Sequence, residues 1–463
     1  MPKDLRSFIE EVAEKRPDDI ARVKREVDPK HELTAVVEKL EKANQFPAVF
    51  FEKVKGSKVP VIINLTASYE RLAMALDTTL DRMVETFCER EQNPIAPKEV
   101  SDGPVKEVIL TGEEADLSVL PIPTHNALDA GPYICSGLGI CKDPESGKHN
   151  LGIYRHMVHD SKTLGNWIYQ AHHGYYVWQR YAEKNEPMPF AIAIGHHPGA
   201  IMGAISRYPG VGGEYDGSGG LLDEPIEVVR AETVDLLVPA RAEIVVEGTV
   251  HPSELRQEGP FGEWPRYYTA TGPKPIVNVT AITMRKDPIY FDIFAAHPEH
   301  NIVGGLPRMG SVYRRAKEVV PSVQAVNMPM SGGARAHAYI SLKKSTDGEP
   351  KLAAFAAFMA ENNVKLVILV DDDIDVFNEQ EVLWAVMSRF EADRDLIVMP
   401  YCLGGQIYPT AYDITRNNPG KMNTKVIVDA TKPVPPTPFP ERAQVPGEWV
   451  EKIDLKEYIL PWA

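Results

Sequence analysis

From Val105 to about Ala296, the middle of this 463-residue chain reads as strands joined by turns, with one short helix near residues 173–183. A turn sequence at 143–147 separates two apolar runs in the manner of a hairpin. The strand-like runs cover residues 134–141, 150–159, 190–194, 243–247, 276–284 and 289–294. So many strands with so few helices predict a barrel-like β domain rather than a doubly wound parallel sheet.

Helical and strand-like patterns alternate on both sides of this β region. The first part predicts helices at 3–45 and 68–91 and strands at 48–51 and 59–65. The last part predicts helices at 308–319, 351–361 and 379–390, strands at 325–328, 338–341 and 364–370, and a proline-rich extended tail at 433–440. Because 463 residues exceed one ordinary core, we predict three domains, at 1–104, 105–305 and 306–463.

Charge and cysteine usage narrow the class of protein. The formal charge of −15 opposes binding to nucleic acid or to an anionic membrane, so an anionic substrate needs a local cationic pocket. The four cysteines form no CxxC pair, which indicates free thiols in a reducing compartment. The chain shows no signal-peptide core and no apolar run of transmembrane length. We therefore expect a cytoplasmic protein.

Two carboxylates, Glu258 and Glu263, flank the sequence Gly-Pro-Phe-Gly. Glycine and proline disfavour a helix and favour a tight bend, which can bring both carboxyl groups to one side of the chain. Phe261 and Trp264 supply apolar walls that can desolvate one of them. Carboxyl pairs whose pKa values are pushed apart take acid and base roles. The alternative is a surface turn with two solvated acids.

Two segments together give the chain a family resemblance. The run 150–155, which ends in Arg155, and the run 258–263 resemble the UbiD-like reversible decarboxylases, which use prenylated FMN. Further segments in matching order are 152–159, 171–174, 214–215, 239–248 and 370–375. One departure is the segment after Glu214, which is a residue longer than the family pattern.

The resemblance implies a fold and a catalytic set. The implied fold is an α+β or α/β multidomain protein, in which a central split β-barrel holds the flavin between an N-terminal α/β domain and a C-terminal α/β oligomerisation domain. The catalytic set falls on Arg155, Glu258 and Glu263. A charge-assisted pair with Arg155 is expected to keep Glu258 ionised, and Glu263, desolvated by Phe261 and Trp264, is expected to move protons.

The resemblance also implies a cofactor site. Its metal ligands fall on Asn150, His173 and Glu214, a donor set that suits Mn²⁺, or Mg²⁺ less well. K⁺ is expected alongside, near residues 204–207. His172 is the second choice for the imidazole ligand or a flavin contact. The full predicted cofactor-binding set is Asn150, Ile153, Arg155, His172, His173 and Glu214.

Three further residues, His300, Arg308 and Arg335, are candidate cationic groups. If they face inward, a bound anion is needed to offset the cost of burying their charge. They resemble the second-carboxylate pocket of furan-2,5-dicarboxylate decarboxylases, which makes that acid the expected substrate and furan-2-carboxylate the product. The alternative is a surface pair between Arg308 and Glu299. Rival readings are decarboxylation of a hydroxybenzoate, pyrrole or indole acid, a catalytically silent subunit, and a plain flavin-reducing barrel.

The resemblance implies four partners: the aromatic acid, CO₂, a flavin prenyltransferase that supplies the cofactor, and further copies of the chain in a dimer or hexamer-of-dimers assembly. Two other features indicate structure rather than chemistry. Adjacent strand residues point in opposite directions, so His196 and His197 are expected to be structural. The glycine-rich run 210–220 lacks the ending of a phosphate loop and is expected to present Glu214.

Overall fold

The structure is a computed structural model and describes residues 2–168, 172–206, 213–405, 407–411 and 422–459. Arg207, predicted near K⁺, and the first part of the glycine-rich run lie outside these residues. Within them, no helix is both long enough and apolar enough to cross a membrane.

The N-terminal part is a small sheet with four helices. Its strands, in the order β1-β2-β3-β16, are Ile20–Val23, Ala48–Phe51, Val61–Ile63 and Tyr290–Phe291. Its helices are α1 (Leu5–Lys15), α2 (Glu32–Lys42), α3 (Tyr69–Ala75) and α4 (Met83–Glu91). The single helices predicted at 3–45 and 68–91 are wrong. Pro17, which lacks an N–H, ends the first after α1, and Asp77 at φ 48° ends the second after α3.

The central part is a nine-stranded sheet in the order β6-β9-β10-β15-β14-β11-β7-β8, with β5 beside β15. In chain order the strands are β5 (Val108–Thr111), β6 (Tyr133–Ile134), β7 (Leu138–Lys142), β8 (His149–Ile153), β9 (His156–Asp160), β10 (Thr163–Gly165), β11 (Met188–Ile194), β14 (Ile244–Glu258) and β15 (Gly272–Met284). The predicted hairpin is present as β7 and β8. Across the described residues the two end strands, β6 and β8, do not pair, so the sheet is open there.

Smaller elements surround the central sheet. They are α5 (His173–Lys184), α6 (Pro198–Ala204), α7 (Glu214–Leu222), and a three-stranded sheet of β13 (Leu237–Pro239), β12 (Glu227–Arg230) and β4 (Lys98–Glu99). The longest strands, β14 and β15, pair from Ile244 opposite Met284 to Glu258 opposite Gly272. Glu258 is therefore the last residue of a long strand whose pairing with β15 shifts register twice, after Glu247 and after Val250.

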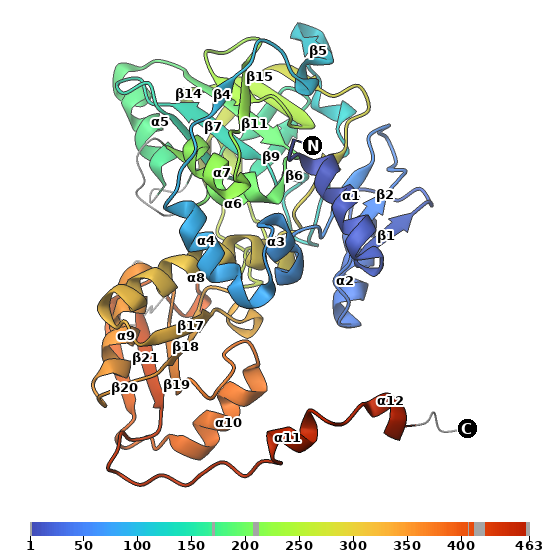
Figure 1. Ribbon diagram of the computed structural model, residues 1–463. Coiled ribbons are helices and arrows are strands. Elements are labelled where there is room, and N and C mark those ends of the chain that lie inside the picture. The colour runs from blue at the N-terminus through green and yellow to red at the C-terminus, as the bar shows by residue number, and fades with distance from the viewer. Residues whose placement is uncertain (1, 169–171, 207–212, 406, 412–421, 460–463) are drawn as a thin grey trace.

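The C-terminal part is a five-stranded sheet in the order β17-β18-β19-β21-β20. Its strands are Val323–Asn327, His337–Leu342, Leu366–Asp371, Met422–Ala430 and Leu396–Leu403. Its helices are α8 (Pro298–Val319), α9 (Glu349–Ala360) and α10 (Glu379–Arg389), with α11 (Gly447–Val450) and α12 (Leu455–Tyr458) on an extended tail (Figure 1). Parallel pairing of β18, β19 and β21 agrees with the predicted βαβ layout.

Helix α8 joins the central and C-terminal parts (Figure 1). It begins ten residues earlier than predicted, because the His297 side chain accepts from the Glu299 N–H and Pro298 suits the first turn. One continuous hydrophobic cluster runs from the N-terminal helices through α8 to the C-terminal sheet, with Leu72, Phe87, Ile201, Leu221, Met309 and Ile340 among its members. The three parts of the chain therefore share one hydrophobic core around α8.

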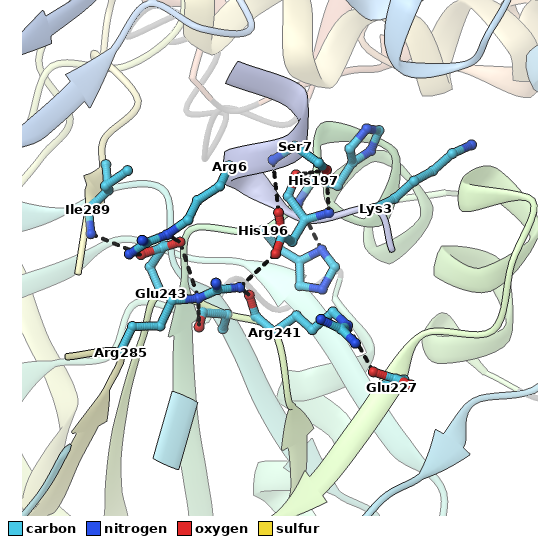
Figure 2. A network of polar contacts seen from close by, with 12 residues as sticks. Lys3, Arg6, Ser7, His196, His197, Glu227, Arg241, Glu243, Arg285 and Ile289 are labelled. Atoms are coloured by element: carbon cyan, nitrogen blue, oxygen red, sulfur yellow. Dashed lines mark hydrogen bonds and ion pairs between the residues drawn. The ribbon is translucent and has the colours of Figure 1, made fainter. Parts of the chain in front are cut away.

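An ionic network fixes α1 against the ends of β14 and β15 (Figure 2). Arg6 donates to the fully buried Glu243 at 2.9 Å, and Arg285 donates to Asp4 at 2.8 Å. Burial lowers the pKa of His196 to about 4 and that of His197 to about 3, so both are neutral. The His197 ring accepts from the Gly199 N–H and caps α6, a structural role as predicted.

Candidate active site

The structure brings Arg155, Glu258 and Glu263 into direct contact. Arg155 lies in the break between β8 and β9, and its Nε donates to Glu258 Oε1 at 3.0 Å. Its Nη1 donates to Glu263 Oε1 at 2.9 Å, and its Nη2 reaches the Thr269 hydroxyl at 3.3 Å. One guanidinium therefore holds both carboxylates of the predicted bend, and the alternative of a solvated surface turn is wrong.

Aromatic rings enclose this guanidinium. Its Cζ lies 4.0 Å from the centre of the Trp167 ring and 4.6 Å from the centre of the Phe261 ring. Lys274 Nζ lies 3.9 Å from the centre of the same Trp167 ring. Cation–π contacts of this kind gain strength where water is excluded. The two rings and the two carboxylates therefore hold the Arg155 guanidinium together.

The two carboxylates lie in different surroundings, and the difference is opposite to the one predicted. Glu258 has no exposed surface, and burial raises its pKa to about 7, although Arg155 and Lys274 oppose the shift. The Glu263 side chain keeps 14% of its surface exposed. The Phe261 ring packs against the Arg155 guanidinium, and Glu258, the last residue of β14, is fully buried. Arg155 therefore does not hold Glu258 fully ionised.

A neighbouring loop fixes the bend that carries the carboxylates. The Gly262 N–H donates to Asp129 Oδ1 at 2.8 Å, and the Ala130 N–H donates to the Pro260 carbonyl at 3.0 Å. A Cβ on Gly262 would lie 2.6 Å from Asn126 Nδ2, so the close approach requires glycine. Sequence reasoning missed Asp129, because nothing in the local sequence links it to a segment more than a hundred residues away.

The three predicted metal ligands also meet. Asn150 on β8 donates through Nδ2 to Glu214 Oε1 at 2.7 Å, and His173 Nδ1 lies 3.3 Å from the same oxygen. His173 and Glu214 begin α5 and α7. The hydrogen bond to Glu214 raises the pKa of His173. One carboxylate, one imidazole and one amide gather here. They suit Mn²⁺ or Mg²⁺ when the amide is turned so that its Oδ1, which accepts from the Tyr154 hydroxyl at 3.3 Å, faces Glu214.

The other predicted cofactor residues border this cluster. Ile153 ends β8 between Asn150 and Arg155, and the His172 ring lies 5.7 Å from that of Tyr154. A Cβ on Gly174 would lie 2.6 Å from the Tyr154 hydroxyl, so glycine lets α5 begin close to β8. Across the described residues, no group of three or more His, Cys, Asp or Glu side chains could hold a metal ion. A site here therefore depends on the Asn150 amide.

His300, Arg308 and Arg335 form a second cluster beside the carboxylate bend. A Cβ on Gly304 would lie 2.7 Å from Arg335 Nη2 and 2.8 Å from Arg308 Nη1, so both guanidinium groups converge where Gly304 leaves room. Arg335 donates to the His300 carbonyl at 3.2 Å and lies 5.2 Å from the centre of the Trp264 ring. Trp264 follows Glu263 in the chain, so the two clusters are adjacent.

Two expectations for this cluster are wrong. Burial, and then Arg335 and Arg308, lower the pKa of His300 well below its usual value, so His300 is neutral rather than cationic. Arg308 pairs with the buried Glu361, at 3.2 Å, and not with Glu299. Glu299 is also buried and accepts from the Asn64 and Thr66 N–H groups. Arg308, which pairs with Glu361, and Arg335 therefore supply the positive charge.

Comparison with known proteins covers nearly the whole chain. The N-terminal, Rift-related and C-terminal domains of 3-octaprenyl-4-hydroxybenzoate carboxy-lyase match residues 13–91, 98–298 and 301–430. The UbiD-class enzyme HmfF from Pelotomaculum thermopropionicum, solved in complex with FMN, is 37% identical, with a TM-score of 0.91 over 98% of this chain and 100% of that chain.

Two further relatives agree. An evolved dimeric form of HmfF from the same organism, solved in complex with prFMN, is 35% identical, with a TM-score of 0.88 over 99% of this chain and 100% of that chain. A phenolic acid decarboxylase of Sedimentibacter hydroxybenzoicus is 33% identical over 99% of this chain and 98% of its own length. This chain belongs to the UbiD family of carboxy-lyases and is a decarboxylase.

Proposed function

We propose that the protein catalyses the reversible, non-oxidative decarboxylation of furan-2,5-dicarboxylate to furan-2-carboxylate through prenylated FMN. The observation that carries this proposal is the presence of two adjacent cationic positions. Arg155 lies against Glu258 and Glu263, and the Arg308–Arg335 pair lies beside the next residue, Trp264. A flat acid with two carboxylates matches this arrangement, since one carboxylate can be held while the other leaves.

The cofactor fits the residues present. We assign the flavin to the open central sheet, as the split barrel of a domain spanning 105–305, between domains at 1–104 and 306–463. Asn150, His173 and Glu214 would hold its phosphate through Mn²⁺ or Mg²⁺, with K⁺ nearby and with Ile153 and His172 at the flavin. The bound group supplies an electrophilic carbon that accepts electron density as CO₂ leaves.

The reaction consumes one proton, because a hydrogen replaces the lost carboxylate on the ring. Glu263 is the residue we assign to deliver it. Its side chain keeps some exposure, so a bound substrate ring can reach it, whereas Glu258 has no exposed surface. Arg155 binds both carboxyl groups and orients them. Glu258, with its pKa raised to about 7 by burial, can hold a proton in reserve at neutral pH.

The two arginines at Gly304 should determine the preference for a dicarboxylate. Each lost charge-assisted contact costs about 1.5–3 kcal/mol, or roughly tenfold or more in specificity. We expect Arg335→Ala and Arg308→Ala each to lower the ratio of kcat/KM for furan-2,5-dicarboxylate over furan-2-carboxylate by about that factor. Steady-state kinetics with both acids measures the ratio.

Arg315→Ala is the matched control. Arg315 lies on α8, as Arg308 does, but it is exposed and pairs with Glu318. Its ratio should equal that of the wild type. An unchanged ratio in both pocket variants, or a wild type that prefers a monocarboxylate, would contradict the furan dicarboxylate. A hydroxybenzoate, pyrrole or indole acid would then be the substrate to test. The contact of Arg155 with both carboxylates argues against a catalytically silent subunit.

We also propose partners beyond the substrate and CO₂. A flavin prenyltransferase would supply the cofactor, and copies of this chain would form a dimer or a hexamer-of-dimers assembly. Support for self-association comes from the tail, where every described residue from 441 to 459 is exposed. Its large exposed side chains are Val445, Trp449, Val450, Ile453, Leu455, Tyr458 and Ile459. An apolar segment of this kind is typical of a contact with another chain.

A further inference from the structure

Two buried polar atoms, one from Glu258 and one from His159, face the same small space above Gly165. A Cβ built on Gly165 would lie 2.9 Å from Glu258 Oε2 and 3.3 Å from His159 Nε2. Both atoms are inaccessible to solvent, and neither has a hydrogen-bond partner among the described residues. An unsatisfied carboxylate oxygen and an unsatisfied imidazole nitrogen this close together are within reach of one bridging water.

The elements around this space hold it in place. Gly165 ends β10, between β9, which carries His159, and β15, whose partner β14 ends at Glu258. Glycine is what leaves the space open, because any side chain would press on the Glu258 carboxylate. The strands thus bring His159 and Glu258 together from positions about a hundred residues apart in the chain.

His159 connects this space to the surface. It is only partly buried and precedes the exposed Asp160, which accepts from Arg256 at 2.7 Å. The charged and titratable groups that influence His159 are Arg256 and Asp160. Those around Glu258 are Arg155, Lys274, Glu263 and Tyr133. Glu258 itself has no exposed surface, so a solvent proton must pass through another group to reach it.

We propose that His159 is a relay that passes protons from solvent to Glu258 through a water held above Gly165. The inference rests on the proposed function, which consumes one proton in each turnover. The His159 imidazolium gives its Nε2 proton to the water as the water gives one to the Glu258 carboxylate. The neutral ring, which is only partly buried, then turns Nε2 toward solvent, takes a proton there and turns back. After Glu263 has protonated the ring, the Glu258 carboxyl gives its proton to the Glu263 carboxylate, while Arg155, which binds both groups, keeps its own protons.

The pKa values of both groups suit the transfer. Burial raises the pKa of Glu258 to about 7, so this carboxylate accepts a proton near neutral pH. Burial, together with Arg256, lowers the pKa of His159, so its ring gives a proton up readily. His159 touches no reacting atom and acts through Glu258.

The test uses the cofactor-loaded enzyme and His159→Ala. We expect kcat to fall by about ten- to a hundredfold with KM unchanged, and added imidazole to restore the rate in proportion to its concentration. Gly165→Ala should also lower kcat, without rescue by imidazole, because its methyl group fills the space. Gly272→Ala, whose Cβ meets nothing within 4 Å, is the matched control and should keep wild-type rates.

A second readout needs no turnover. After a rapid drop in pH, the infrared carboxylic-acid band that is absent in Glu258→Gln reports protonation of Glu258, and it should appear at least about tenfold more slowly in His159→Ala. Wild-type rates of band formation in both His159→Ala and Gly165→Ala would overturn the relay, as would a kcat loss that imidazole does not reverse. Absence of CO₂ release by the wild type, with the band slowed as expected, would reject the proposed function and keep the relay.

Discussion

Glu263→Gln should lower kcat for decarboxylation by about a hundredfold to ten-thousandfold, the usual contribution of a positioned general acid. Glutamine keeps the size of the side chain and can still accept from Arg155, but it has no proton to deliver. Flavin occupancy should stay at the wild-type level, because Glu263 lies in the bend after β14 and not among the residues around Glu214. CO₂ release and the flavin absorbance spectrum measure the two quantities.

The matched control is Glu254→Gln, an exposed glutamate on β14 that contacts Asn278 and none of the catalytic groups. It should retain wild-type kcat. Solvent-hydrogen exchange into furan-2-carboxylate gives a second comparison, since the reverse of proton delivery needs the same carboxylate. Exchange at the wild-type rate in Glu263→Gln would show that another group, with Glu258 first in line, delivers the proton.

Glu214→Ala should purify without flavin colour and without bound divalent metal. Its carboxylate oxygen is the point where Asn150 and His173 meet, so its loss removes the centre of the donor set. Mutating outer-shell partners of metal sites typically costs about ten- to a hundredfold in metal affinity, and loss of a ligand should cost at least the upper value. With no metal, nothing would offset the charge of a flavin phosphate in a chain of net charge −15.

Asp223→Ala is the control for this experiment, because Asp223 follows the other end of α7 and is exposed. It should bind flavin and metal as the wild type does. Metal analysis and flavin absorbance on the same preparations make the comparison. A colourless Glu214→Ala protein with full metal content would separate the metal from the flavin, and full content of both would remove Glu214 from the site.

The sequence predicted which residues meet, but not how buried each becomes. Arg155, Glu258 and Glu263 could be identified because the runs 150–155 and 258–263 resemble the UbiD-like decarboxylases. The burial of Glu258 depends on the register of β14 against β15, which the local sequence does not specify. The predicted roles of desolvation at the two carboxylates were reversed for this reason.

Other features needed the three-dimensional structure. Asp129 fixes Gly262 from more than a hundred residues away, and His159 and Gly165 meet Glu258 from almost a hundred residues away, with no periodic or motif signal. The neutral state of His300 follows from its burial beside two arginines. Periodicity correctly indicated the strand-rich centre and the βαβ layout of the last part. It predicted too long a first helix, because the apolar spacing continues past Pro17, a residue that cannot extend a helix.

The central claim is that this chain removes one carboxylate from a dicarboxylated furan and replaces it with a proton from solvent. The most direct measurement is to load the protein with prenylated FMN and Mn²⁺, add furan-2,5-dicarboxylate in D₂O, and analyse both products. We expect CO₂, and furan-2-carboxylate that carries one deuterium on the carbon that lost its carboxylate. If the loaded protein releases no CO₂ from this acid and releases it from a hydroxybenzoate, pyrrole or indole acid instead, the substrate proposal is contradicted.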